Sequence, residues 1–141
     1  MEPPKTTAYI AVPIGWVESA LADLKQAPMQ GDEGAPDAWL VFAPEMADGV
    51  RDLAPGDDLI VLTWLHRGDR DVLVTRPRGD AERPMTGVFS TRSPDRPNPI
   101  GLHRVRVLAT DGLRILVGPL EAVDGTPVLD VKPVLDPVAE R

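Results

Sequence analysis

The sequence predicts a mainly β domain: a closed or nearly closed barrel with one or two short helices. Seven or eight short apolar segments rich in β-branched residues follow one another, with no long helical segments between them. The 16 prolines and 12 glycines are spread along the chain as turn signals. A chain of 141 residues with 43% hydrophobic content can bury one core, so we expect a single domain over residues 1–141. Residues 1–5 and about 136–141 are expected to be peripheral tails.

The first half of the chain contains strand-like segments and one helical segment. We expect strands at Ala8–Val12, Gly15–Ser19 and Ala38–Phe42, with a turn-rich segment from Asp23 to Asp37. Pro44 suits the first position of a helix, which we expect over Glu45–Leu53. The most apolar run, Leu59–His66, is predicted to be a central strand.

The second half contains only short extended segments. We expect strands at Val72–Arg76, Gly87–Ser90, Leu102–Leu108, Leu113–Val117 and Val128–Val131. Alternation along Leu102–Leu108 places Arg104 and Arg106 on one face and His103, Val105 and Val107 on the other. The turn residues Thr110, Asp111 and Gly112 indicate a β-hairpin between this segment and Leu113–Val117.

Several classes of function are excluded or disfavoured by composition. The absence of cysteine excludes disulfides, thiolate catalysis and cysteine-based metal sites, and the two histidines show no metal-ligand spacing, so we expect no metal. No glycine-rich nucleotide fingerprint follows a strand. No apolar run reaches 18 residues, and no apolar segment follows Met1–Lys5, so we expect a cytoplasmic protein without a membrane partner.

The net charge of −7 is unevenly distributed. Residues 61–110 carry nine arginines and no lysine against five carboxylates, whereas the flanking segments are acidic. A solvated face with scattered arginines is one interpretation. A local anion site is the other, because arginine favours bidentate contact with carboxylate or phosphate.

The segment from Thr91 to Gly101 is the strongest candidate for a ligand-binding loop. Its three prolines restrict the backbone and predict a stiff loop that loses little entropy when it holds a ligand. Arg92 and Arg96, four residues apart on this frame, are predicted to face a carboxylate or phosphate. The alternative is a proline-rich surface loop with two solvated arginines.

Two other segments carry candidate polar groups. Asp124 and Gly125 are typical of a tight turn, after which Asp130 and Lys132 share one face of a strand. This pattern also fits an ordinary turn followed by a surface ion pair. His66, at the end of its apolar segment, is either structural or borders a pocket.

These residues resemble a known family. Gly87 to Gly101, Asp124 to Val128 and Asp130 to Pro133 are similar to motifs of the TsaA-like (YaeB, TrmO) family, as is the opening segment Ile14–Ser19. The segment Ala27–Gly31 resembles the Pro-Arg-Gln loop of that family. The resemblance extends in order over nearly the whole chain.

The resemblance implies a single-sheet β-barrel that binds S-adenosyl-L-methionine and works as a homodimer. It also implies a methyltransferase that acts on N6 of threonylcarbamoyladenosine beside the tRNA anticodon. Matched positions place the cofactor contacts on Pro28, Met29, Gln30, His66, Arg67, Arg92, Leu102, Gly118, Pro119, Leu120 and Glu121. Arg96 and Lys132 are candidates for substrate binding. His66, Asp124 and Asp130 are candidates to accept a proton if the methyl acceptor is a nitrogen.

The sequence departs from the family pattern at the places that concern the acceptor. Met29 replaces the arginine of the Pro-Arg-Gln loop, and Val134 replaces the usual tyrosine. The chain ends at Arg141, where the longer tRNA enzymes continue. Two alternatives therefore stay open beside tRNA methylation: a small-molecule methyltransferase on the same scaffold, and a non-catalytic barrel that binds the cofactor or RNA.

Overall fold

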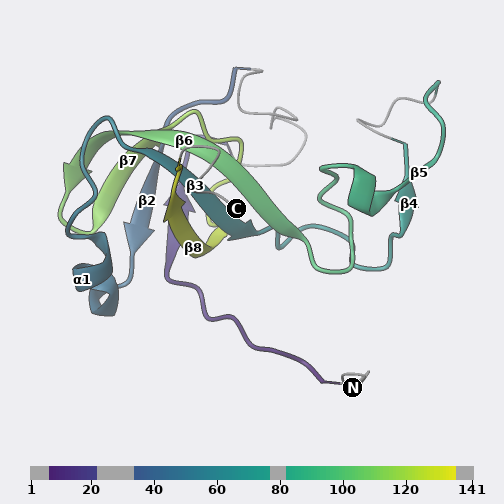
Figure 1. Ribbon diagram of the computed structural model, residues 1–141, viewed down its shortest axis with the longest axis horizontal. Helices are drawn as coiled ribbons and strands as arrows, with labels where there is room; N and C mark the ends of the chain where they lie inside the picture. The colour runs from purple at the N-terminus through teal and green to yellow at the C-terminus, as the bar shows by residue number, and fades with distance from the viewer. Residues whose placement is uncertain (1–6, 22–33, 77–81, 136–141) are drawn as a thin grey trace.

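The computed structural model describes residues 7–21, 34–76 and 82–135, and a closed antiparallel sheet dominates these ranges (Figure 1). Its strands lie in the order β1 (Gly15–Glu18), β2 (Ala38–Phe42), β7 (Arg114–Gly118), β6 (Ile100–Asp111), β3 (Asp58–Trp64) and β8 (Pro127–Pro133), and β8 pairs with β1. Each of these strands has two hydrogen-bonded neighbours, so none of them presents an edge. The predicted mainly β fold with short helices is confirmed.

The core lies inside this sheet. Inward side chains alternate with outward ones along each strand, and the register places Val17, Leu40 and Ile115 side by side on β1, β2 and β7. His103, Val105 and Val107 share one face as predicted, and that face is buried. Arg106 faces outward and binds Asp58 on β3 at 3.0 Å; this hydrogen bond lowers the pKa of the Asp58 carboxyl.

The predicted helix is present but short. A 3-10 turn, η2 (Pro44–Met46), begins at the proline and leads into α1 (Ala47–Val50), where Val50 is buried against the core. Pro44 occupies the first turn because its missing N–H would have no helical partner there. Figure 1 shows α1 at the opposite end of the barrel from β4 and β5.

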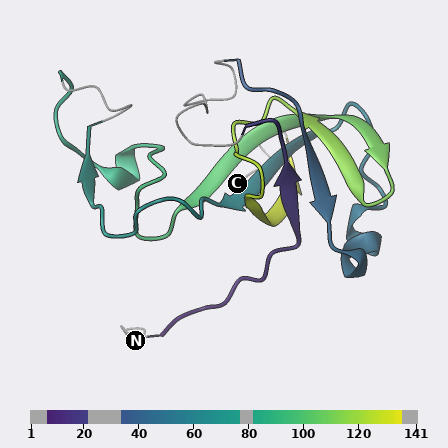
Figure 2. The same ribbon diagram turned by 180° about the vertical axis from the view of Figure 1, so that it is seen from behind.

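The prediction of a strand at Ala8–Val12 is wrong. Residues 7–13 have no regular structure and run away from the barrel, and Tyr9 and Ile10 are about nine-tenths exposed (Figure 2). High β propensity makes a strand only where a neighbouring strand supplies hydrogen bonds. The pairing of β1 begins at Gly15, where any side chain would collide with the Val41 carbonyl oxygen.

The chain between β3 and β6 forms a projection, here called the arm: residues 66–76 and 82–99. It contains β4 (Val74–Thr75) and β5 (Thr86–Gly87), which pair only with each other, and a 3-10 turn, η4 (Val88–Ser90). Both views show these elements standing apart from the barrel (Figures 1 and 2). The predicted strand Gly87–Ser90 is therefore wrong beyond Gly87. The chain turns there because the Thr91 amide and hydroxyl both donate to the Val88 carbonyl.

A bulge in β8 decides which way its polar side chains point. Thr63 on β3 pairs with Val128, but Leu62 pairs with Asp130, so Leu129 is an extra residue. Val128 faces the core, and the shift turns Asp130 and Lys132 outward, where they form an ion pair at 3.0 Å. The prediction that these two residues share a face is confirmed.

Candidate functional site

The topology brings three connections to one end of the barrel, here called the loop end. Strands β1, β3 and β7 finish at this end, and β2, β6 and β8 begin there. The connections are residues 19–37, residues 65–99 and residues 119–126. All three carry residues predicted to bind the cofactor, although these residues are far apart in sequence.

Most of the predicted cofactor residues lie in these connections or at the end of β7, and one, Leu102, lies on β6. Pro28, Met29 and Gln30 belong to the first connection and lie outside the described residues. His66, Arg67 and Arg92 are exposed on the arm. Gly118, Pro119, Leu120 and Glu121 lie at the end of β7 and in the third connection. Leu102 is on the outer face of β6, opposite Leu62.

The two ends of the arm are fastened to each other. The Arg70 guanidinium donates to the Pro97 carbonyl at 2.7 Å and to the Asn98 side chain at 3.0 Å, and it lies over the Trp64 ring. The Asp69 amide donates to the Asp95 carboxylate at 2.8 Å. Sequence reasoning did not single out Arg70; its place among the arginines of residues 61–110 was the available signal.

The Arg96 side chain stabilises the loop of the arm to which it belongs. Its guanidinium donates to the carbonyl oxygens of Thr91 and Ser93 at 2.9 and 3.0 Å and lies over the Phe89 ring. Prolines in this loop contribute no N–H groups, so the side chain supplies donors that the backbone lacks. One guanidinium nitrogen of Arg96 is therefore already used within the loop, and a shared anion for Arg92 and Arg96 stays a prediction. The substrate role of Arg96 stays a prediction.

Arg92 is the cation that remains available on this loop. Its side chain is exposed, and it makes no hydrogen bond, ion pair or ring contact with any residue that the structure describes. The same loop that holds Arg96 against its own carbonyls thus presents Arg92 outward. A guanidinium on a braced loop is suited to a carboxylate or phosphate ligand.

The third connection begins tightly packed. A side chain at Gly118 would collide with Asp37, and a cis peptide bond joins Gly118 to Pro119. The Leu120 side chain is fully buried, and its amide donates to the Pro36 carbonyl at 3.0 Å. Leu120 is therefore a core residue, and it fixes the backbone from which the half-buried Glu121 projects.

Glu121 contacts His103, which the sequence pattern placed only on the same strand face as Val105 and Val107. The Nδ1 atom of His103 lies 2.5 Å from Glu121 Oε1, and Nε2 lies 2.7 Å from the Thr63 hydroxyl. His103 and Thr63 are buried, and Glu121 Oε2 has no partner among the described residues. A histidine on the same strand face as Val105 and Val107 was the signal for this arrangement.

The remaining candidates lie in two places. Asp124 is at the loop end, where its carboxylate accepts the Ser19 amide at 2.9 Å and joins the third connection to the start of the first. The predicted turn is confirmed, since Gly125 has a φ of 83°. Asp130 and Lys132 lie on the outer wall of the barrel and pair with each other, away from the three connections.

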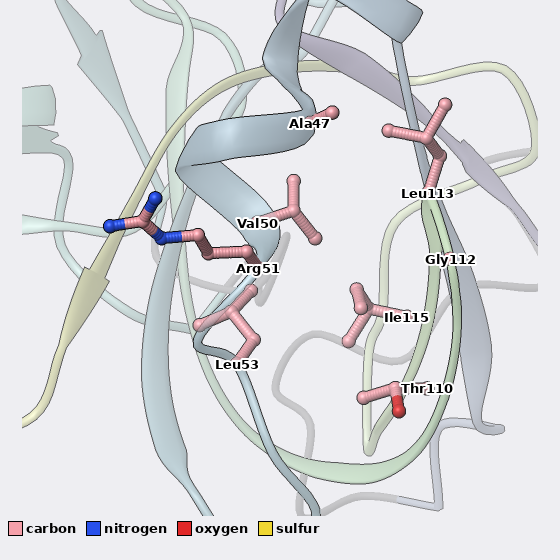
Figure 3. Close-up of a pocket in the computed structure, with 8 residues that line it drawn as sticks. All are labelled: Ala47, Val50, Arg51, Leu53, Thr110, Gly112, Leu113 and Ile115. Atoms are coloured by element: carbon pink, nitrogen blue, oxygen red, sulfur yellow. The ribbon is translucent and has the colours of Figure 1, made fainter.

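A cavity of about 350 Å³ lies at the other end of the barrel, between α1 and the hairpin of β6 and β7 (Figure 3). Its lining is mostly apolar, including Val50, Leu113 and Ile115, and the Arg51 guanidinium points away from Ile115. A binding site for a polar ligand needs converging polar groups. The loop end has such groups, and we place the candidate site there.

Comparison with known proteins agrees with this architecture. The model of the family described as the tRNA-methyltransferase O N-terminal domain matches residues 16–138. A probable S-adenosyl-L-methionine-binding protein of Methanothermobacter thermautotrophicus is 40% identical over 126 residues, which are 89% of this chain and 90% of that protein. An S-adenosyl-L-methionine-binding protein of Archaeoglobus fulgidus is 41% identical, covering 87% of each chain.

Longer relatives match this chain over only part of their own length. A second, probable S-adenosyl-L-methionine-binding protein of Archaeoglobus fulgidus is 42% identical over 85% of this chain, which corresponds to 32% of its own length. The crystal structure of TrmO from Pseudomonas aeruginosa superposes with a TM-score of 0.72 at 26% identity. That match covers 97% of this chain and 62% of the TrmO chain.

Among the described residues, no helix has the length and apolar character needed to cross a bilayer. The closed sheet, the arrangement of the three connections and the match over most of the sequence lead to one assignment. The chain belongs to the family of the tRNA-methyltransferase O N-terminal domain.

Proposed function

We propose that this chain binds S-adenosyl-L-methionine at the loop end of the barrel and acts as a methyltransferase. The observation that carries the proposal is the convergence of three connections that bear the expected cofactor residues at one end of the sheet. The names of the relatives as S-adenosyl-L-methionine-binding proteins support the choice of cofactor.

The available groups fit the polar parts of this cofactor. Arg92 offers a guanidinium for the methionine carboxylate, which is the pairing that arginine makes best. Glu121 keeps one carboxylate oxygen without a protein partner in the described residues, and its side chain is 18% exposed. That oxygen can accept from the cofactor's amino group or ribose hydroxyls.

When bound, the cofactor supplies a methyl group on a positively charged sulfur, which a nucleophile takes by in-line displacement. The protein then has to align the acceptor and exclude water. A nitrogen acceptor must also lose a proton. We favour His66 for this step, because Asp124 holds the Ser19 amide and Asp130 is paired with Lys132. The exposed His66 ring makes no hydrogen bond or ion pair with a described side chain.

We propose tRNA as the acceptor, at N6 of threonylcarbamoyladenosine. The description of the matching family and the exposed arginines of the arm support this acceptor. Incubating the protein with methyl-labelled cofactor and either bulk tRNA or a metabolite extract tests it. Label in tRNA is expected; label only in small molecules, or binding without turnover, would overturn tRNA methylation in favour of the corresponding alternative.

Replacing Arg92 with alanine is expected to weaken S-adenosyl-L-methionine binding about ten- to hundredfold, because a charge-assisted contact is lost. Isothermal titration calorimetry measures this affinity. Arg104→Ala is the matched control: it removes another exposed arginine, from the outer wall of β6, and is expected to leave the affinity unchanged. Equal affinities for the Arg92 variant and the parent chain would remove Arg92 from the site.

We also propose that two copies of the chain associate through the arm. Large apolar side chains are exposed there, including Leu73 (62%), Met85 (53%) and Phe89 (77%). An isolated two-stranded sheet such as β4–β5 is marginal by itself, so a second copy would stabilise it. Sedimentation velocity is expected to show a dimer that Leu73→Glu dissociates. A monomer at micromolar concentration would contradict this proposal.

A further inference from the structure

We propose that His103 is a positioning residue that holds the Glu121 carboxylate in place for the cofactor. The inference rests on the proposed function, because it assumes that Glu121 contacts S-adenosyl-L-methionine. It adds a residue of β6 that lies outside the three connections. Thr63 on β3 completes the arrangement, so two strands of the barrel wall support one side chain of the site.

The three side chains form a continuous hydrogen-bonded chain. Thr63 Oγ1 lies 2.7 Å from His103 Nε2, and His103 Nδ1 lies 2.5 Å from Glu121 Oε1. Thr63 is fully buried and His103 is 4% exposed, whereas the Glu121 side chain is 18% exposed. The chain therefore starts inside the barrel and reaches the surface only at Glu121.

The positions of the partners determine where the protons lie. A carboxylate accepts hydrogen bonds, so the proton of this hydrogen bond lies on His103 Nδ1, which donates to Glu121 Oε1. In the neutral ring, Nε2 then accepts from the Thr63 hydroxyl. The ring is thus held in one tautomer and one orientation by its two partners. In metal sites, a hydrogen bond to the ring nitrogen that does not bind the metal fixes a histidine in the same way.

This order of groups also occurs in hydrolases, where a carboxylate and a histidine activate a hydroxyl. That role does not fit here. The hydroxyl belongs to Thr63, which is fully buried, so no substrate can reach it. The accessible end is Glu121 Oε2, and the useful result of the chain is a fixed carboxylate.

Gly101 makes room for this chain. A Cβ atom at Gly101 would collide with Thr63 Oγ1 and would lie 2.7 Å from His103 Nε2. The proline-rich loop of the arm therefore ends at a residue whose missing side chain lets the Thr63–His103 contact form. The loop that presents Arg92 and the chain that holds Glu121 thus meet at one position of β6.

Fixing Glu121 before binding favours the bound state. A glutamate has several rotatable bonds, and ordering such a side chain during binding costs free energy. A residue that orders it in advance removes part of that cost. Loss of the His103–Glu121 contact should therefore weaken cofactor binding even when the fold is intact.

A matched pair of variants tests the proposal by calorimetry with S-adenosyl-L-methionine. In His103→Asn the amide nitrogen can replace Nδ1 and keep the bond to Glu121. In His103→Gln the amide nitrogen can occupy the position of Nε2, where it donates to the Thr63 hydroxyl oxygen and keeps a hydrogen bond to Thr63. Each variant loses one of the two hydrogen bonds, so similar unfolding temperatures are expected. Affinity is expected to fall about tenfold or more for His103→Gln and less than about threefold for His103→Asn.

The possible outcomes separate this inference from the proposed function. Equal affinities for the two variants would overturn the positioning role while leaving cofactor binding intact. Absence of binding by the parent chain would overturn the proposed function, and the positioning role with it. Nitrogen-15 spectra of the unaltered protein provide a readout that needs no variant: a His103 ring without a proton on Nδ1 would overturn the proposal, and a protonated Nδ1 supports it.

Discussion

Replacing Gly101 with alanine is expected to lower the free energy of unfolding by about 2–4 kcal/mol. The new methyl group would occupy the space of the Thr63 hydroxyl and the His103 ring, both of which are buried. Either the β6 backbone moves away from β3, or the hydrogen bond between Thr63 and His103 breaks. The first response strains the barrel and the second leaves buried polar groups without partners. Chemical denaturation measures the loss.

Gly49→Ala is the matched control for this substitution. Nothing lies within 4 Å of a Cβ at Gly49, which is in α1. Alanine is favoured over glycine within a helix by about 0.5–1 kcal/mol, so this variant is expected to be neutral or slightly more stable. If both variants behaved alike, the explanation from the space around Gly101 would be wrong.

Replacing Leu40 with alanine is expected to cost about 2–5 kcal/mol of unfolding free energy. Leu40 is fully buried on β2 and lies between Val17 and Ile115 on the neighbouring strands. Each strand of the barrel is hydrogen-bonded on both sides, so the wall cannot easily collapse into the cavity that the substitution leaves. Thermal or chemical unfolding of the variant measures the effect.

Leu108→Ala removes the same atoms from a different environment. Leu108 is 42% exposed at the bulge of β6, so its loss is expected to change the free energy of unfolding by less than about 1 kcal/mol. A similar cost at both positions would show that Leu40 does not act through burial in the barrel core.

Local patterns predicted most of the barrel strands. Ala38–Phe42 forms β2 with the predicted bounds, and the hairpin of β6 and β7 was expected from its alternation and its turn at Gly112. Ala8–Val12 has an equally strong strand pattern but is exposed and unpaired. Residue pattern expresses a preference for extended backbone, and pairing decides whether a strand forms.

The candidate site, like the fold, was predicted from the sequence only in part. The sequence identified Arg92 and Arg96 as a pair, because their spacing and the prolines were visible in it. The sequence did not show that the Thr91 and Ser93 carbonyl oxygens would accept hydrogen bonds from Arg96. These bonds turn Arg96 toward its own loop, while Arg92 stays exposed. The bulge at Leu129 likewise sends Asp130 and Lys132 to the outer wall, and a bulge depends on the register with β3.

The sequence by itself determined the mainly β class, the strand face that His103 shares with Val105 and Val107, and the motifs that resemble the family. These follow from residue types and spacings that act over a few residues. Only the tertiary structure decided that three distant connections meet at one end of the barrel, and that His103 lies between Thr63 and Glu121. The reason is physical: strand order and register bring His103 against Thr63, 40 positions away in the chain, and against Glu121, 18 positions away, and no local preference encodes these contacts.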